Sequence, residues 1–175
     1  MLLNLKGADV SGKGAFIILT REDAKTLFAQ TEDSDIRRTV EALRQSPKHR
    51  DAGLVLECGT AWDPIHRCLT EGTLAPDAGE FPLDHCVLGG RRLHPGAEFE
   101  AVLVRPDIVP HVADGLHNLK REEFRSCFMN LDPSDFGRQP TEAEADEVWS
   151  TLKLVRQLYE DASSEHAAVV FTVER

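Results

Sequence analysis

The sequence has no apolar stretch approaching the roughly 18 residues that a helix needs to cross a bilayer, and its first residues lack the apolar core of a signal peptide. Cysteine is scarce as well: the four residues Cys58, Cys68, Cys86 and Cys127 are irregularly spaced. In a chain long enough to form its own core, such spacing argues against a disulfide framework. We therefore expect a cytoplasmic protein whose thiols stay reduced.

Positive charge is also in short supply, because 20 lysines and arginines face 30 aspartates and glutamates, for a net charge of −10. A surface of this sign repels nucleic-acid phosphates and anionic lipid headgroups. The basic residues form short, separate clusters, at Arg37-Arg38, Lys48-His49-Arg50 and Arg91-Arg92, which is typical of a solvated surface. We predict no nucleic-acid partner and no membrane partner, whereas a basic protein partner suits this charge.

Signs of disorder, internal repeats and linkers are absent too. Hydrophobic residues make up 41% and charged residues 29% of the 175 positions, as in ordinary globular domains. A chain of this length buries roughly 70% of its unfolded surface, so it needs no metal or disulfide to fold. We predict a single domain over residues 14–175, preceded by an N-terminal extension over residues 1–13.

Short apolar segments with the length of strands occupy residues 15–19, 54–58, 99–104 and 167–173. The first and the last are apolar throughout, which is typical of inner strands covered on both faces. Helical periodicity follows over residues 20–28, 33–46, 62–69, 106–116, 121–128 and 141–162, and both Thr20 with Asp23 and Thr141 with Glu144 have the spacing of a capping box. We predict an α/β fold, a three-layer sandwich with helices on both faces of a central mixed sheet.

The segment from Gly7 to Lys13 has the glycine and lysine spacing of a phosphate-binding loop. In such a loop the next residue is a Ser or Thr that binds magnesium, and a helix follows. Here Gly14 stands at that position and a predicted strand follows. We therefore interpret this segment as a flexible leader.

Trp62 and His66 lie one turn apart on a predicted helix whose first residue is ambiguous, because either Thr60 or Asp63 can cap it. The imidazole can line an aromatic-walled pocket, or it can be a packed histidine on a mostly apolar face. Asp63 can likewise cap the helix or pair with a nearby arginine. We expect Trp62 to be mostly buried and His66 to be partly accessible from a cleft beside the Leu88-Gly89-Gly90 turn.

Cysteine and histidine are ligands that zinc prefers, and Cys58, His66, Cys68, His85 and Cys86 supply them. The paired spacings that bring two ligands together are absent, so we predict no metal and no cofactor. A nucleophile pair such as Cys86 with His66 is conceivable in space, but no spacing supports it. Adjacent residues such as His85 and Cys86 would point to opposite faces of a strand.

Three segments taken together resemble the YfbM-like family of uncharacterised bacterial proteins. They run from Ala61 to Thr70, from Pro82 to Gly90, and from Trp149 to Tyr159 into the final strand. The resemblance covers most of the chain from Gly14 onward and implies a three-layer α/β sandwich. It implies no activity. Pro64 departs from the family pattern, which usually has a residue that favours helix at this position.

The incomplete catalytic set and the acidic charge favour a non-catalytic domain that binds a small ligand or a protein partner. The alternative is an enzyme of unassigned reaction with a pocket that includes His66, His85 and Cys86. The candidate ligand-binding residues are Trp62, Asp63, His66, His85, Gly89 and Gly90.

Overall fold

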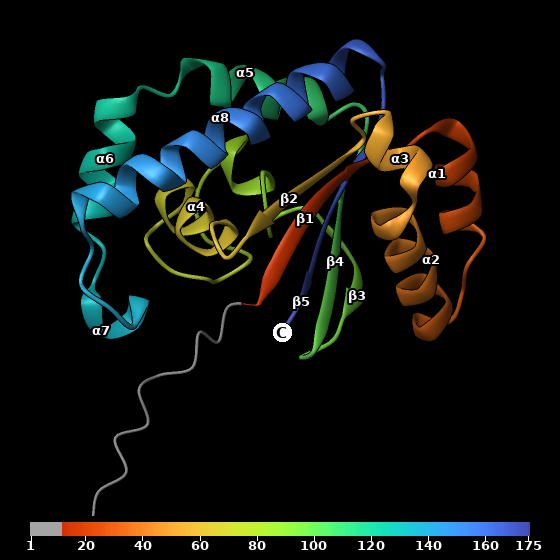
Figure 1. Ribbon diagram of the computed structural model, residues 1–175, viewed down its shortest axis with the longest axis horizontal. Helices are drawn as coiled ribbons and strands as arrows, with labels where there is room; N and C mark the ends of the chain where they lie inside the picture. The colour runs from red at the N-terminus through yellow and green to blue at the C-terminus, as the bar shows by residue number, and fades with distance from the viewer. Residues whose placement is uncertain (1–11) are drawn as a thin grey trace, which may run out of the picture.

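The computed structural model describes residues 12–175, which form a central sheet with helices packed against it (Figure 1). The predicted extension over residues 1–13 and the loop spacing from Gly7 to Lys13 lie almost wholly outside the described residues. Lys13 is the first residue of strand β1 (Lys13–Ile18). The segment that follows the lysine is therefore a strand, as predicted, and not the helix that a phosphate-binding loop requires.

The sheet has five strands in the order β2-β1-β5-β4-β3. Besides β1 these are β2 (Val55–Gly59), β3 (Arg91–Pro95), β4 (Phe99–Val104) and β5 (Val169–Glu174). The prediction that the first and last strands lie inside the sheet is confirmed, because β1 and β5 are both flanked by neighbours.

The α/β class is also confirmed, but the prediction of a mixed sheet is wrong. All neighbouring strands run antiparallel. An uninterrupted apolar run indicates that a strand is covered on both faces, which is typical of parallel sheets. Here the same apolar runs occur in an antiparallel sheet, so the run itself carries no information on strand direction.

Helices α1 (Arg21–Phe28), α2 (Asp33–Gln45) and α3 (Pro47–Asp51) lie beside one face of the sheet, on the right in Figure 1. The remaining helices lie on the other side, and they are α4 (Trp62–Leu69), η1 (Leu83–His85), α5 (Val109–Asn118), α6 (Arg121–Met129), α7 (Pro133–Phe136) and α8 (Glu142–Ser164). The buried apolar side chains form two clusters. One contains Phe16 and Phe171 and the other contains Ile17 and Val170, because successive residues of a strand point to opposite faces.

The predicted caps define where α1 and α8 begin. The hydroxyl of Thr20 accepts a hydrogen bond from the Asp23 amide at 3.1 Å, and the Asp23 carboxylate accepts one from the Thr20 amide at 3.0 Å. This is a complete capping box. The hydroxyl of Thr141 accepts from the Glu144 amide at 3.2 Å, while the Glu144 carboxylate pairs with Arg138.

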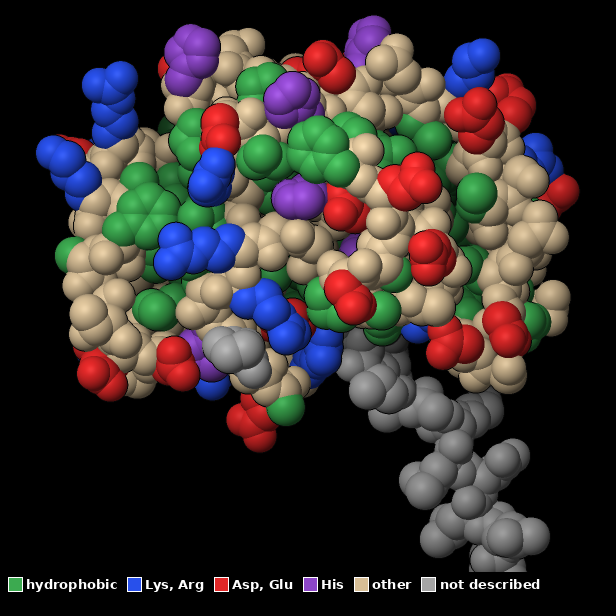
Figure 2. All heavy atoms as spheres, turned by 180° about the vertical axis from the view of Figure 1, so that it is seen from behind, with side chains coloured by type: hydrophobic (Ala, Val, Ile, Leu, Met, Phe, Trp, Pro, Cys, Tyr) green, Lys and Arg blue, Asp and Glu red, His purple; other side chains and the backbone are tan. Residues whose placement is uncertain are grey.

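The surface seen from behind in Figure 2 has acidic and basic side chains interspersed, with apolar side chains between them. No continuous basic stripe crosses the part of this face that belongs to residues 12–175. Within the same residues no helix combines the length and the apolar character needed to span a bilayer. The predicted cytoplasmic location and the predicted choice of partners stay predictions.

Trp62 is fully buried, at 0% exposure, which confirms the expectation for this residue. Its ring packs against Phe171 at a centroid distance of 5.6 Å, and its indole N–H donates to the carbonyl of Gly12 at 3.1 Å. The guanidinium of Arg175 lies over the ring at 5.7 Å from its centroid. The side chain thus ties α4 to both central strands and satisfies its one polar group.

We expect Trp62→Ala to lower the free energy of unfolding by about 3–5 kcal/mol, because the vacated volume cannot be refilled by its neighbours. Urea denaturation followed by circular dichroism measures the change. Trp149→Ala is the matched control, since Trp149 is only partly buried and packs on the surface of Phe124. An equal loss in both variants would contradict a central role for Trp62.

Candidate functional site

The residues proposed around Trp62 lie together on α4, but they do not open to solvent. His66 is 0% exposed, so the prediction that it is partly accessible is wrong. The Nε2 atom of His66 lies 3.1 Å from the carbonyl of Ala75, and Nδ1 has no hydrogen-bond partner among residues 12–175. Asp63 pairs with Arg67 on the next turn at 2.6 Å, in agreement with the second role considered for it. The helix face that carries these residues is core.

His85, Gly89 and Gly90 lie in the segment that packs beside α5. The Nδ1 atom of His85 is 2.7 Å from the Asp84 carboxylate. A Cβ on Gly89 would come within 2.2 Å of the Asp84 carbonyl, and one on Gly90 within 2.5 Å of the Leu103 carbonyl. Close backbone packing therefore requires both glycines, whether or not they contact a ligand.

A small hollow of about 370 Å³ does lie beside the Leu88-Gly89-Gly90 turn. Leu88, Arg92, Glu100 and Arg175 line it, and none of the candidate ligand-binding residues does. The ligand-binding role of those candidates stays a prediction.

The enzymatic alternative relied on Cys86 and its neighbours. Cys86 is fully buried, and this burial raises the pKa of its thiol far above the ordinary value of 9.0. A buried neutral thiol is a poor nucleophile. Its backbone carbonyl has a structural role, since it accepts a hydrogen bond from the buried hydroxyl of Tyr159 at 2.7 Å. Among residues 12–175, no group of three or more His, Cys, Asp or Glu side chains could hold a metal ion.

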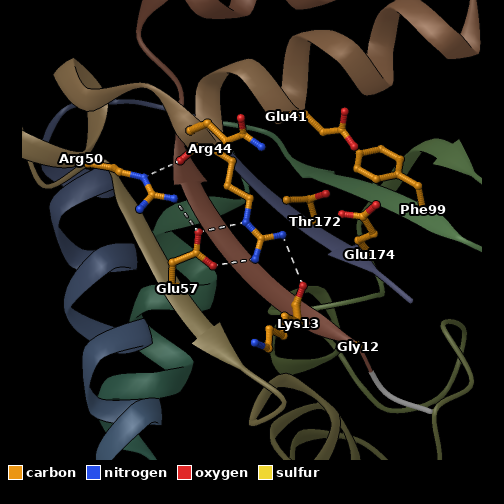
Figure 3. Close-up of a pocket in the computed structure, with 10 residues that line it drawn as sticks. Gly12, Lys13, Glu41, Arg44, Arg50, Glu57, Phe99, Thr172 and Glu174 are labelled. Carbon is orange, nitrogen blue, oxygen red and sulfur yellow. Dashed lines mark hydrogen bonds and ion pairs between the residues drawn. The ribbon is translucent and has the colours of Figure 1, made fainter. Parts of the chain in front are cut away.

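A different concave site lies between α2 and the sheet (Figure 3). We call it the α2 hollow. It has a volume of about 440 Å³, and its polar lining includes Glu41 and Arg44 of α2 with Lys13, Glu57, Thr172 and Glu174 of three neighbouring strands. This volume is within the range of small-molecule sites.

The register of the central strands creates the floor of the α2 hollow. Thr172 on β5 lies opposite Ala15 on β1 and opposite Ala101 on β4. Ala15 and Ala101 are both 0% exposed, so the floor of the hollow is closely covered around Thr172. Thr172 is 1% exposed, and its hydroxyl has no hydrogen-bond partner among residues 12–175.

Cationic side chains gather on the β2 side of the α2 hollow. Arg44 forms a two-pronged pair with Glu57, with Nε to Oε1 at 2.9 Å and Nη2 to Oε2 at 2.5 Å. This pairing raises the pKa of Arg44, so the guanidinium stays charged. Arg50 also reaches Glu57, at 3.2 Å, and Lys13 lies beside the group with no ion pair of its own among residues 12–175. Arg44 and Arg50 thus face one carboxylate, while Lys13 on β1 lies opposite Glu174 on β5 in the sheet register.

Carboxylates lie on the opposite side, over β5 and β4. Arg37 donates to Glu41 at 3.0 Å and to Glu174 at 3.0 Å, using one oxygen of each carboxylate. The same guanidinium lies over the ring of Phe99 at 5.1 Å from its centroid. In Figure 3 Glu41, Glu174 and Phe99 lie on one side of Thr172, and Arg44, Arg50 and Glu57 lie on the other.

Sequence reasoning missed this site, because its members are spread over separate elements. Thr172 is one polar residue within an apolar strand, and Arg44 reads as an ordinary solvent-facing residue of a helix. The signal that the sequence offered for this site was a threonine within a strand that is otherwise apolar. Its significance depends on the alanines opposite it, and therefore on a strand register that the sequence does not show.

Comparisons with known proteins place the chain among proteins whose function is unknown. The family model described as a domain of unknown function (DUF1877) matches residues 11–172. Among solved structures, the crystal structure of YfbM from Escherichia coli, a protein of unknown function, is similar with a TM-score of 0.66 and 21% identity, and the match covers 92% of this chain and 99% of that one. The comparison with curated proteins gives no match. The resemblance to the YfbM-like family is confirmed, and at this identity the likeness shows the fold alone.

The buried histidine makes stability depend on pH. Burial lowers the pKa of His66 below its ordinary value of 6.5. The unfolded chain then binds a proton at this residue more readily than the folded chain does, so the free energy of unfolding decreases as pH falls through 6.5 toward the lowered pKa. We expect His66→Gln, which keeps a donor for the Ala75 carbonyl, to remove this part of the pH dependence. Urea denaturation at a series of pH values measures it, and a profile as steep as that of the unmodified chain would contradict the assignment.

Proposed function

The chain belongs to the DUF1877 family of domains of unknown function, and we propose that it is a non-catalytic domain that binds a small polar ligand in the α2 hollow. The observation that carries the proposal is the Thr172 hydroxyl, which is buried at the floor of a charged concavity and has no hydrogen-bond partner among residues 12–175. Leaving a buried hydroxyl unpaired costs about 1–3 kcal/mol. A ligand that hydrogen-bonds to this group removes that cost, so the site favours an occupant.

Binding is favoured over catalysis because Thr172 is not activated. A hydroxyl nucleophile needs a base within hydrogen-bond reach, and the Thr172 hydroxyl has no such neighbour among residues 12–175. The charged groups nearest to it already pair with one another, Arg44 with Glu57 and Arg37 with Glu41. Such an arrangement can recognise and orient a ligand, but it lacks a poised acid and base.

A small ligand is also favoured over a protein partner. Protein partners commonly use contiguous apolar patches. The large apolar side chains exposed here, among them Phe28, Phe81 and Leu154, lie on different elements. The α2 hollow, by contrast, is a concavity with polar groups on several sides, which suits a small molecule.

We also infer that the fold is the three-layer sandwich predicted from the sequence, which gives the α2 hollow one wall from a helix layer and one from the sheet. The support for this interpretation is the pair of apolar clusters, which use alternate residues of the central strands. Under this arrangement the hollow lies between the helix layer of α1 to α3 and the sheet.

Thr172→Val tests the proposal because it removes the hydroxyl and nearly preserves the side-chain volume. We expect the ligand-free variant to be more stable by about 1 kcal/mol, since the unpaired polar group is gone. A thermal-shift screen of amino acids, carboxylic acids, amines and sugar phosphates on the unmodified chain identifies ligands, because binding to the folded state raises Tm. The variant should bind them about five- to tenfold more weakly, the worth of about one hydrogen bond.

The matched control is Thr151→Val on α8, which removes a hydroxyl that bonds within its own helix, to the Glu147 carbonyl. It should leave the thermal shifts unchanged. Two results would contradict the proposal. One is a loss of stability in Thr172→Val greater than that of the control, which would mean that the hydroxyl has a structural partner. The other is an undiminished thermal shift in Thr172→Val.

A further inference from the structure

Resting on the function proposed above, we propose that the ligand is a short linear zwitterion that lies across Thr172 with its acid group toward Arg44 and Arg50 and its amine toward Glu41 and Glu174. The division of charge within the α2 hollow carries this inference. Two arginines face one carboxylate at the β2 side, two carboxylates share one arginine at the β5 side, and Lys13 on β1 lies opposite Glu174 in the sheet register.

Each side keeps unused hydrogen-bonding capacity. The Nη1 atom of Arg50 makes no hydrogen bond among residues 12–175, so it can donate to an acid group. Glu41 and Glu174 each use one carboxylate oxygen for Arg37, which leaves the second oxygen of each for an ammonium. In Figure 3 Thr172 lies between the two sides, below the middle of a ligand that spans them.

Ligands of a single sign fit this lining poorly. A dianion would place one of its charges beside Glu41 and Glu174, and a diamine would place one beside Arg44 and Arg50. Like charges at close range are repulsive, more so in a partly buried site than in water. A molecule with one charge of each sign meets an opposite charge at both ends.

The spacing of the strands gives the scale of the ligand. Glu57 on β2 and Glu174 on β5 are separated by β1, the strand between them in the sheet. Glu57 is level with Thr172 in the register, and Glu174 lies two residues farther along β5, so steps of about 4.8 Å between strands and about 3.4 Å per residue put the two sides roughly 12 Å apart. Once a hydrogen-bond length is allowed at each end, the ligand has its amine and carboxylate at opposite ends of a chain of several bonds. An amino acid with a terminal amine and a short peptide share this chemistry.

Titration calorimetry of the full chain with matched compounds tests the inference. The compounds are 5-aminopentanoate, which has both charges, pentanoate and pentylamine, which have one each, and glycylglycine, which has a similar spacing of charges with an amide between them. We expect 5-aminopentanoate or glycylglycine to bind at least about tenfold more tightly than pentanoate and pentylamine. Tighter binding of 5-aminopentanoate identifies the ligand as an amino acid with a terminal amine, and tighter binding of glycylglycine identifies it as a short peptide.

Glu41→Gln removes one carboxylate of the amine side while leaving the cationic side intact. It should lower the preference for the zwitterion over pentanoate by about fivefold or more. Glu142→Gln is the matched control, because it removes the same charge from an exposed pair with Arg125 outside the hollow. The control should leave the preference unchanged.

Failure of this inference can be told apart from failure of the proposed function. If pentanoate binds as tightly as 5-aminopentanoate, the hollow is an anion site, and if Glu41→Gln leaves the preference unchanged, the amine does not lie at Glu41. Either result means that the two-ended orientation is wrong. If none of these compounds binds while another class gives a thermal shift that Thr172→Val abolishes, the zwitterion is wrong and the proposed function stands. If no compound in either experiment depends on Thr172, both are wrong.

Discussion

The antiparallel pairing of β1 with β5 is the constraint on which the rest of the molecule depends. These strands lie at the centre of the sheet, and their register sets Phe16 opposite Phe171 and Ala15 opposite Thr172. The aromatic pair faces α4 and α8, where Trp62 and Tyr159 pack against it. The small pair faces α2. A shift of one residue would exchange the two faces, placing threonine in the aromatic core and phenylalanine under the helix.

This register gives the two faces different properties. On the aromatic face, the polar atoms of Trp62 and Tyr159 both find backbone carbonyls, so that side is built for stability. On the α2 face, alanines flank Thr172, whose buried hydroxyl has no hydrogen-bond partner among residues 12–175. Natural cores are closely packed and rarely leave a buried hydroxyl without a partner. Within residues 12–175 the Nδ1 atom of His66 is buried without a partner as well, and what sets Thr172 apart is that it lines a charged concavity.

Much of the fold could be predicted from local patterns, whereas the candidate site could not. The apolar runs predicted both central strands, and the Thr20 and Thr141 spacings predicted where two helices begin, because such signals depend on neighbouring residues. The predicted strand direction was wrong, because an apolar run indicates that a strand is buried but not which way it runs relative to its neighbours. The spacing of Trp62 and His66 correctly placed both residues on one face of a helix. It could not distinguish a face that lines a pocket from a face that is buried in the core, and in the structure this face is buried. The α2 hollow brings together residues as distant as Arg44 and Thr172, whose proximity follows from tertiary packing.

Mapping of backbone amide chemical shifts by NMR tests the central claim most directly, with the intact chain and the compound that raises Tm most. The account predicts that the changes centre on Lys13 to Ala15, Glu41 to Gln45 and Phe171 to Glu174, the segments that surround the α2 hollow. Changes centred instead on Leu88, Arg92 and Arg175, which line the hollow on the other face of the sheet, would contradict it. In that case the ligand site would lie beside the Leu88-Gly89-Gly90 turn, and the unpaired hydroxyl of Thr172 would have no part in binding.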